Sequence, residues 1–64
     1  MKTKTVAIVA NKKTGEIRSI EIFHVYFEEI PYTQRRWISI ESTKKMLKSK
    51  NSKILNIYYY EYAQ

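Results

Sequence analysis

Seven Lys and Arg residues lie between positions 35 and 53, and the net charge of this segment equals that of the whole chain. The 64 residues hold twelve Lys plus Arg against six Glu, a net charge of +6. The residues before this segment sum to +1 and those after it to −1. Clustered cations neutralise phosphates and release counterions, so the segment predicts nucleic-acid binding. The candidate nucleic-acid-binding residues are Arg35, Arg36, Lys44, Lys45, Lys48, Lys50 and Lys53.

Two alternatives remain open for this basic segment. A cationic face also docks on an acidic protein surface, or it only keeps a small protein soluble. If the segment is helical, Lys44 and Lys48 are neighbours four residues apart. Like charges at that spacing repel by roughly 0.2–0.5 kcal/mol. A negatively charged partner would relieve this repulsion.

The C-terminal segment Tyr58-Tyr59-Tyr60-Glu61-Tyr62 is rich in aromatic rings. Strand side chains alternate between two faces, so alternate tyrosines share one face with Asn56. Flat rings beside cations can stack exposed bases. Tyrosine is also a favoured strand residue, and aromatic faces are common at protein interfaces. The candidate stacking or partner-binding residues are Trp37, Tyr58, Tyr60 and Tyr62.

Residues for enzymatic or metal chemistry are scarce. The chain has one His, one Gly, no Cys and no Asp. His24 lies in an apolar stretch and is predicted to be structural rather than catalytic. Glu28 and Glu29 are predicted to be solvated, because successive side chains diverge. We therefore expect a non-enzymatic protein without metal or cofactor.

The N-terminal half predicts a β-hairpin that would position these residues. Thr5–Ala10 is apolar on both faces, which is typical of a central strand. Residues 11–16 form a turn signature in which Gly15 takes the left-handed conformation. Residues 17–27 are β-branched and aromatic, and predict a second strand with a bulge near Ile22 and Phe23. A helix over the same residues is the alternative, with apolar side chains at spacings of three and four.

The C-terminal half predicts a third strand over residues 35–41, a short helix over residues 43–50 and a last strand over residues 54–62. Ser42 is the expected N-cap of the helix, and Met46 and Leu47 are its expected buried residues. The expected fold is a single α+β domain over residues 1–64, in the order β-β-β-α-β, with an antiparallel or mixed sheet and one short helix on one face. The expected core residues are Val6, Ile8, Ile38, Ile40, Leu55 and Ile57.

These patterns favour a small, basic, cytoplasmic protein that contacts nucleic acid. Absence of Cys suits a reducing compartment, and no apolar run approaches the roughly 18 residues of a membrane span. The alternative is a protein–protein interaction module, such as a phage-encoded inhibitor of a host enzyme or toxin. It would dock its aromatic face or add an edge strand to its target. A third alternative is a homodimer joined through tyrosine-lined sheet faces, since a small domain gains much from association.

Overall fold

The predicted hairpin forms between β1 (Lys2–Asn11) and β2 (Ile17–Val25) in this computed structural model, which describes residues 1–62. The last two residues of the predicted domain lie outside that range. The side-chain oxygen of Asn11 accepts hydrogen bonds from the backbone N–H groups of Lys13 (2.8 Å) and Thr14 (3.1 Å). Gly15 has a φ of +77°. The predicted turn and its left-handed glycine are therefore confirmed.

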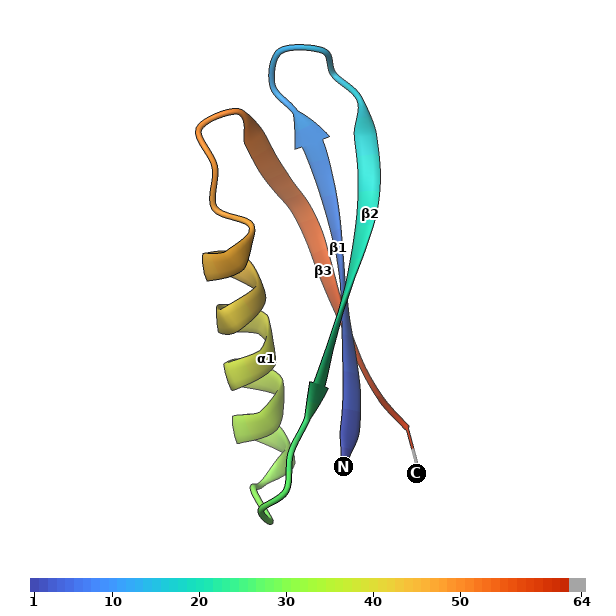
Figure 1. Ribbon diagram of the computed structural model, residues 1–64, viewed down its shortest axis with the longest axis vertical. Coiled ribbons are helices and arrows are strands. Elements are labelled where there is room, and N and C mark those ends of the chain that lie inside the picture. Colours follow the sequence, from blue (N-terminus) through green and yellow to red (C-terminus); the bar gives the residue numbers. More distant parts are fainter. Residues whose placement is uncertain (63–64) are drawn as a thin grey trace.

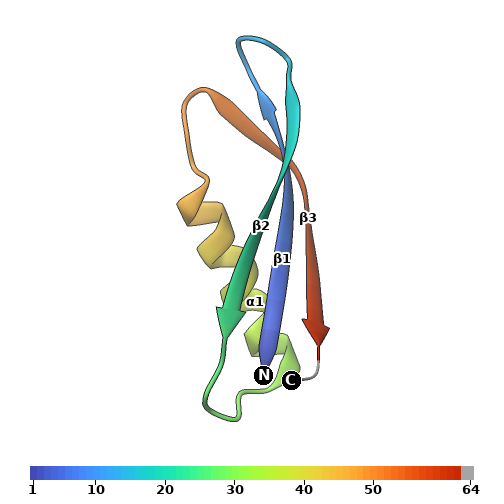
Figure 2. The same ribbon diagram turned by 45° about the vertical axis from the view of Figure 1, so that its right-hand side comes forward.

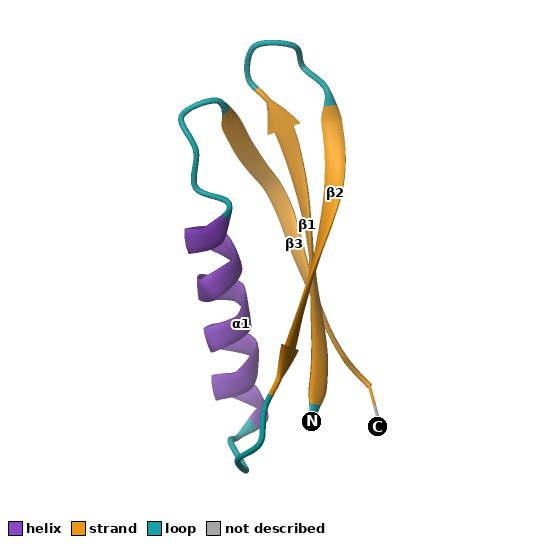
Figure 3. Cartoon of the chain, viewed as in Figure 1, coloured by secondary structure: helices purple, strands orange, loops and turns teal. Residues whose placement is uncertain are grey.

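A third strand, β3 (Ser52–Tyr62), pairs antiparallel with the other edge of β1. The sheet order is β2-β1-β3, so β1 is the central strand, as its two apolar faces predict. One helix, α1 (Tyr32–Met46), connects β2 to β3 and lies against one face of the sheet (Figures 1 and 3). The α+β class, the antiparallel sheet and the single helix on one face are confirmed.

The helix begins earlier than the sequence predicts, and the strand predicted over residues 35–41 is wrong. α1 follows Pro31, which stands at the N-cap position, and Ser42 lies inside the helix rather than capping it. The alternation of Ile38 and Ile40 with Trp37 and Ser39 resembled a strand. The buried face of the helix is instead polar, so hydrophobic spacing could not reveal it.

Small residues form the contact between α1 and the sheet. Thr3, Thr5 and Ala7 on β1 are fully buried, as are Ser39 and Thr43 on the helix. The Thr43 hydroxyl donates to the Ser39 carbonyl at 2.8 Å, which satisfies a buried polar group within the helix. Small side chains at the contact allow the helix backbone to lie close to the sheet.

The expected core was therefore partly wrong. Ala7 and Val9 are the buried hydrophobic residues within residues 1–62. Val6, Ile8, Ile38, Ile40 and Ile57 are half-buried. Met46, expected inside the helix contact, is 66% exposed, and Leu47 is half-buried.

The irregularity in strand pairing lies on β3 and not on β2. β2 pairs with β1 without interruption from Ile17 to Val25, so the bulge predicted near Ile22 and Phe23 is wrong. The pairing of β1 with β3 shifts between Ile8 and Val9, which leaves Leu55 as the extra residue. Leu55 is 48% exposed. The bulge explains why Leu55 does not share the inward orientation expected from alternation with Ile57.

The molecule is elongated, with Cα extents of 41 × 18 × 14 Å. The N-terminus and the end of β3 lie at one end of the long axis, and the β1–β2 turn lies at the other (Figures 1 and 2). Within residues 1–62, no helix is long and apolar enough to cross a membrane.

Candidate nucleic-acid interface

Two loops meet at the end of the molecule that is remote from the termini. The β1–β2 turn and the α1–β3 loop lie side by side there (Figures 1 and 2). The backbone N–H of Lys12 donates to the carbonyl of Asn51 at 2.8 Å and joins them. The Ser49 hydroxyl accepts from the Asn51 N–H at 3.2 Å and tightens the second loop. The pairing of β3 antiparallel to β1 forces this meeting, because β3 must start where β1 ends.

This region, residues 12–18 and 45–53, is called the basic end. It holds seven cations and one acid, Glu16, whereas the rest of the chain holds five Lys or Arg and five Glu. The side-chain charges outside the basic end therefore cancel, and the whole excess of +6 lies within it. Its cations are Lys12, Lys13, Arg18, Lys45, Lys48, Lys50 and Lys53.

The cations of the basic end are free to bind a partner. All seven are exposed. The ion pairs formed within residues 1–62 join Lys4 to Glu21, Arg35 to Glu61 and Lys44 to Glu41, and none involves the basic end. Seven exposed cations beside one carboxylate create a positive field that attracts anions.

A shallow groove of about 400 Å³ runs between the end of α1 and the start of β3. Its polar lining combines two lysines and two hydroxyls, and its apolar lining consists of Leu47 and Ile54. The lining residues are Lys44, Leu47, Lys48, Ser49, Ser52 and Ile54. Lysine and serine are both common donors to phosphate oxygens, so this groove suits a phosphate group.

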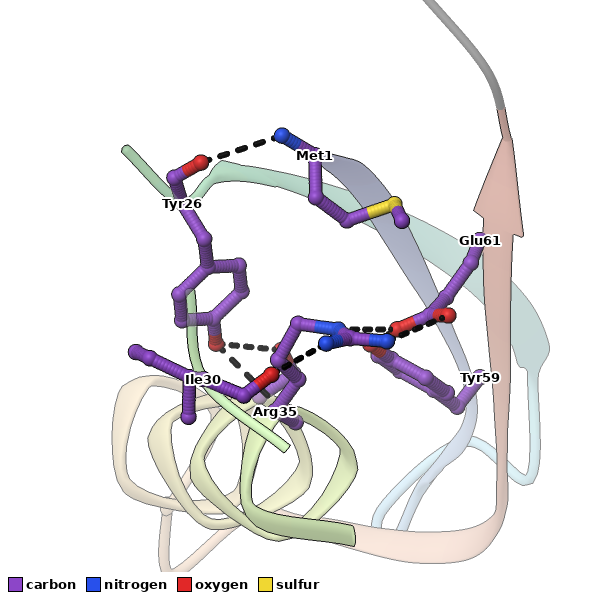
Figure 4. Close-up of polar contacts among 7 residues, drawn as sticks. Met1, Tyr26, Ile30, Arg35, Tyr59 and Glu61 are labelled. Atoms are coloured by element: carbon purple, nitrogen blue, oxygen red, sulfur yellow. Dashed lines mark hydrogen bonds and ion pairs between the residues drawn. The ribbon is translucent and has the colours of Figure 1, made fainter. Parts of the chain in front are cut away.

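Arg35 belongs to the opposite end of the molecule (Figure 4). Its Nε and Nη2 atoms donate to the two carboxylate oxygens of Glu61 at 2.6 and 3.1 Å. Its Nη1 atom donates to the carbonyl of Ile30. The two side chains of the ion pair are 16% and 19% exposed. Arg35 therefore anchors the start of α1 to β3, and its donor atoms already have protein acceptors.

Tyrosines complete the polar network around Arg35. The Tyr59 hydroxyl donates to Glu61 at 2.5 Å, and the Tyr26 hydroxyl lies 2.7 Å from the Ser39 hydroxyl. Hydrogen bonds from Arg35 are the main reason that the pKa of Glu61 falls below its ordinary value. Burial, followed by the hydrogen bond to Glu61, raises the pKa of Tyr59. Glu61 is thus held charged and Tyr59 neutral.

The other predicted basic residues are divided between two places. Lys45, Lys48, Lys50 and Lys53 lie in the basic end, and Lys44 lines the adjacent groove while pairing with Glu41 at 3.2 Å. Arg36 is exposed in the first half of α1, away from the basic end. The sequence segment is therefore not one continuous surface.

The predicted aromatic residues also lie on two different surfaces. Tyr58, Tyr60 and Tyr62 pair with Val6, Lys4 and Lys2 of β1, and paired residues in an antiparallel sheet share a face. That face is turned away from α1, because the alternate β1 residues are the ones buried under the helix. It is called the open face. Trp37 lies on α1, in the other layer, and is 65% exposed.

Sequence reasoning missed three cations of the basic end, namely Lys12, Lys13 and Arg18. They contributed to a near-neutral N-terminal half and so did not stand out by local charge counting. Topology could have found them. An antiparallel pairing of the last strand with the first would have brought the hairpin turn beside the loop that holds Lys48 and Lys50.

No family model, curated protein or solved structure matches this chain. Its function is therefore inferred from its own geometry and charge.

Proposed function

We propose that this protein binds nucleic acid through the phosphate backbone, using the basic end. The observation that carries the proposal is the concentration of the whole +6 excess in two loops joined by the Lys12–Asn51 hydrogen bond. Phosphates are the common cellular groups that such a field attracts most strongly. Arg35 is not proposed to contact phosphate, because its donor atoms already bind the Glu61 carboxylate and the Ile30 carbonyl.

The chemistry of the basic end favours binding that is largely independent of base sequence. Its charged donors are mostly lysines, which act as flexible point charges rather than rigid bidentate forks. Arg18 is its one arginine. Phosphate contacts fix the position of a protein on a nucleic acid but carry no sequence information. The proposed protein is a non-enzymatic binder of a reducing compartment such as the cytoplasm, in keeping with the absence of Cys.

A salt titration tests the proposal most directly. Binding to fluorescent duplex and single-stranded oligonucleotides is measured by anisotropy between about 50 and 200 mM salt. The logarithm of the affinity should fall linearly with the logarithm of salt concentration. The expected slope is about −0.9 per phosphate on duplex and about −0.7 on single strands.

A matched pair of charge reversals tests the location. Lys48→Glu changes the basic end, and Arg36→Glu makes the same change of charge at an exposed helix position outside it. Lys48→Glu should weaken binding about tenfold at low salt, equally for all sequences, because an attraction becomes a repulsion. Arg36→Glu should weaken it less than threefold. Equal losses in the two variants would contradict the assigned location.

The competing function is docking on an acidic protein surface. Failure to bind either oligonucleotide at about 100 μM protein in low salt would remove nucleic acid from consideration. Capture of partners from a nuclease-treated lysate would then be compared between wild type and Lys48→Glu. A protein recovered only by wild type would support the competing function.

A further inference from the structure

The open face of the sheet has no covering layer in the single chain. α1 lies on the other side of the sheet in both views of the ribbon (Figures 1 and 2). Phe23 is 60% exposed, Val25 47%, and Tyr58, Tyr60 and Tyr62 between 41% and 49%. On the central strand between them lie Lys2, Lys4 and the half-buried Val6 and Ile8. Large apolar and aromatic side chains therefore stand on all three strands of this face, interrupted by Lys2, Lys4 and Glu21.

The most deeply buried side chains of the covered face are small. Its buried residues are Thr3, Thr5, Ala7 and Val9 on β1, against Ser39 and Thr43 on α1. The buried hydroxyls of Thr3 and Thr5 have no hydrogen-bond partner within residues 1–62. Ile20, Ile22, Ile54 and Ile57 share this face and are half-buried. The open face nevertheless exposes Phe23, Val25 and three tyrosines, and a sheet normally covers such side chains with a second layer.

We propose that a second copy of the chain covers the open face, sheet against sheet, in a helix–sheet–sheet–helix dimer. Strands of 10, 9 and 11 residues make the face. At about 3.3 Å per residue and about 4.8 Å between strands, it measures roughly 33 by 15 Å. The tyrosine and phenylalanine side chains enlarge this flat area of about 500 Å² towards the roughly 800 Å² per partner of a standard interface.

Chemistry on the open face favours a second copy over nucleic-acid bases. Glu21, whose side chain is 54% exposed, lies on this face beside Lys4, with Nζ and Oε1 3.8 Å apart. With Lys2, this face carries two cations and one carboxylate, against the seven cations and one carboxylate of the basic end. Val6, Ile8 and Val25 offer no flat ring to a base, but they interdigitate well between two packed sheets.

Charge also selects the orientation of the two copies. A two-fold axis perpendicular to the long axis places the basic ends at opposite ends of the dimer. Each basic end then lies beside the end of its partner whose side-chain charges cancel. A parallel arrangement would bring two groups of seven cations together. The antiparallel dimer therefore presents two separate basic ends.

The test is the oligomeric state of wild type and two matched variants by sedimentation, in salt high enough to exclude nucleic acid. Phe23→Glu alters the open face and Trp37→Glu alters an equally exposed aromatic residue on the helix. Wild type and Trp37→Glu should sediment at twice the 7.7 kDa of one chain, and Phe23→Glu as a monomer. Survival of the dimer in Phe23→Glu, or its loss in Trp37→Glu, would overturn the proposal.

Two further measurements cover the case in which Phe23→Glu does not fold. The melting temperature of wild type should rise with protein concentration, because association stabilises the folded chain. Tyr60→Ala should weaken the dimer without changing nucleic-acid affinity at the basic end. A wild type that is monomeric up to about 1 mM, or a Tyr60→Ala variant that loses single-strand affinity while keeping its mass, would overturn the proposal. The open face and the basic end share none of the altered residues, so either proposal can fail alone.

Discussion

The two ends of the long axis use cations in opposite ways. At the end near the termini, Arg35 has protein acceptors for its donor atoms and ties α1 to β3 through Glu61. At the basic end, seven exposed Lys and Arg residues form no ion pair within residues 1–62. The contrast shows that the position of a cation relative to the carboxylates decides its role. One end stabilises the fold, and the other is available to a partner.

Substitution of the adjacent residues Arg35 and Arg36 tests this contrast and should give the largest difference in stability. Arg35→Ala should lower the melting temperature more than any other single change at a charged residue, because it leaves Glu61 and the Ile30 carbonyl without their donor. Arg36→Ala should leave the melting temperature nearly unchanged, since Arg36 is exposed. Thermal unfolding followed by circular dichroism measures both.

The same pair of variants can refute the division into two ends. If Arg35→Ala and Arg36→Ala unfold at the same temperature as wild type, the Arg35–Glu61 pair does not stabilise the fold. Loss of nucleic-acid affinity in a folded Arg35→Ala variant would instead assign Arg35 to the interface.

Acid should weaken the Arg35 end selectively. The pKa of Glu61 is lowered in the folded protein, so the stability it contributes is present above its ordinary value of 4.5. That stability is lost as the pH falls through the lower folded value. The difference in melting temperature between wild type and Glu61→Gln should therefore be largest near neutral pH and shrink below about pH 4. A difference that is constant from pH 7 to about pH 3 would exclude this linkage.

Substitution of the turn glycine at the basic end should have a smaller effect on stability. Gly15→Ala should destabilise the protein by about 1 kcal/mol, because alanine is disfavoured at a φ of +77°. A Cβ atom at this position would meet no atom within 4 Å, so the cost is confined to the backbone. Thr14→Ala is the control, because it leaves the backbone conformation unstrained, although it removes the bond from the Glu16 N–H to the Thr14 hydroxyl. Equal unfolding midpoints for Gly15→Ala and wild type in urea would contradict this assignment.

The hairpin and the last strand were predictable because their information is local. Asn11 and Gly15 specify the turn, and alternating β-branched or aromatic residues specify the strands. The helix was misplaced because its buried residues, Ser39 and Thr43, are polar. Their burial depends on close packing against Thr3 and Thr5, which no local pattern encodes.

The candidate site was predictable only in part, for a related reason. Lys45, Lys48, Lys50 and Lys53 were found as a run of charge, and all four lie between the last turn of α1 and the start of β3. Arg35 was misassigned in the run because its partner Glu61 lies 26 residues away in the sequence. Lys12 and Lys13 were missed because a hydrogen bond between distant loops brings them to the site.

The smallest predicted effect has the opposite sign to that of Arg35→Ala. Lys48→Gln removes one of seven mutually repelling cations at the basic end and breaks no ion pair within residues 1–62. The melting temperature should rise by about 1–2 °C at low salt, since exposed charge interactions contribute only tenths of a kcal/mol. The gain should vanish at about 1 M salt, where the screening length falls to about 3 Å. Arg36→Gln, outside the basic end, serves as the control and should give a smaller rise. A fall in melting temperature for Lys48→Gln at low salt would mean that Lys48 stabilises the fold as Arg35 does, and the contrast between the two ends would not hold.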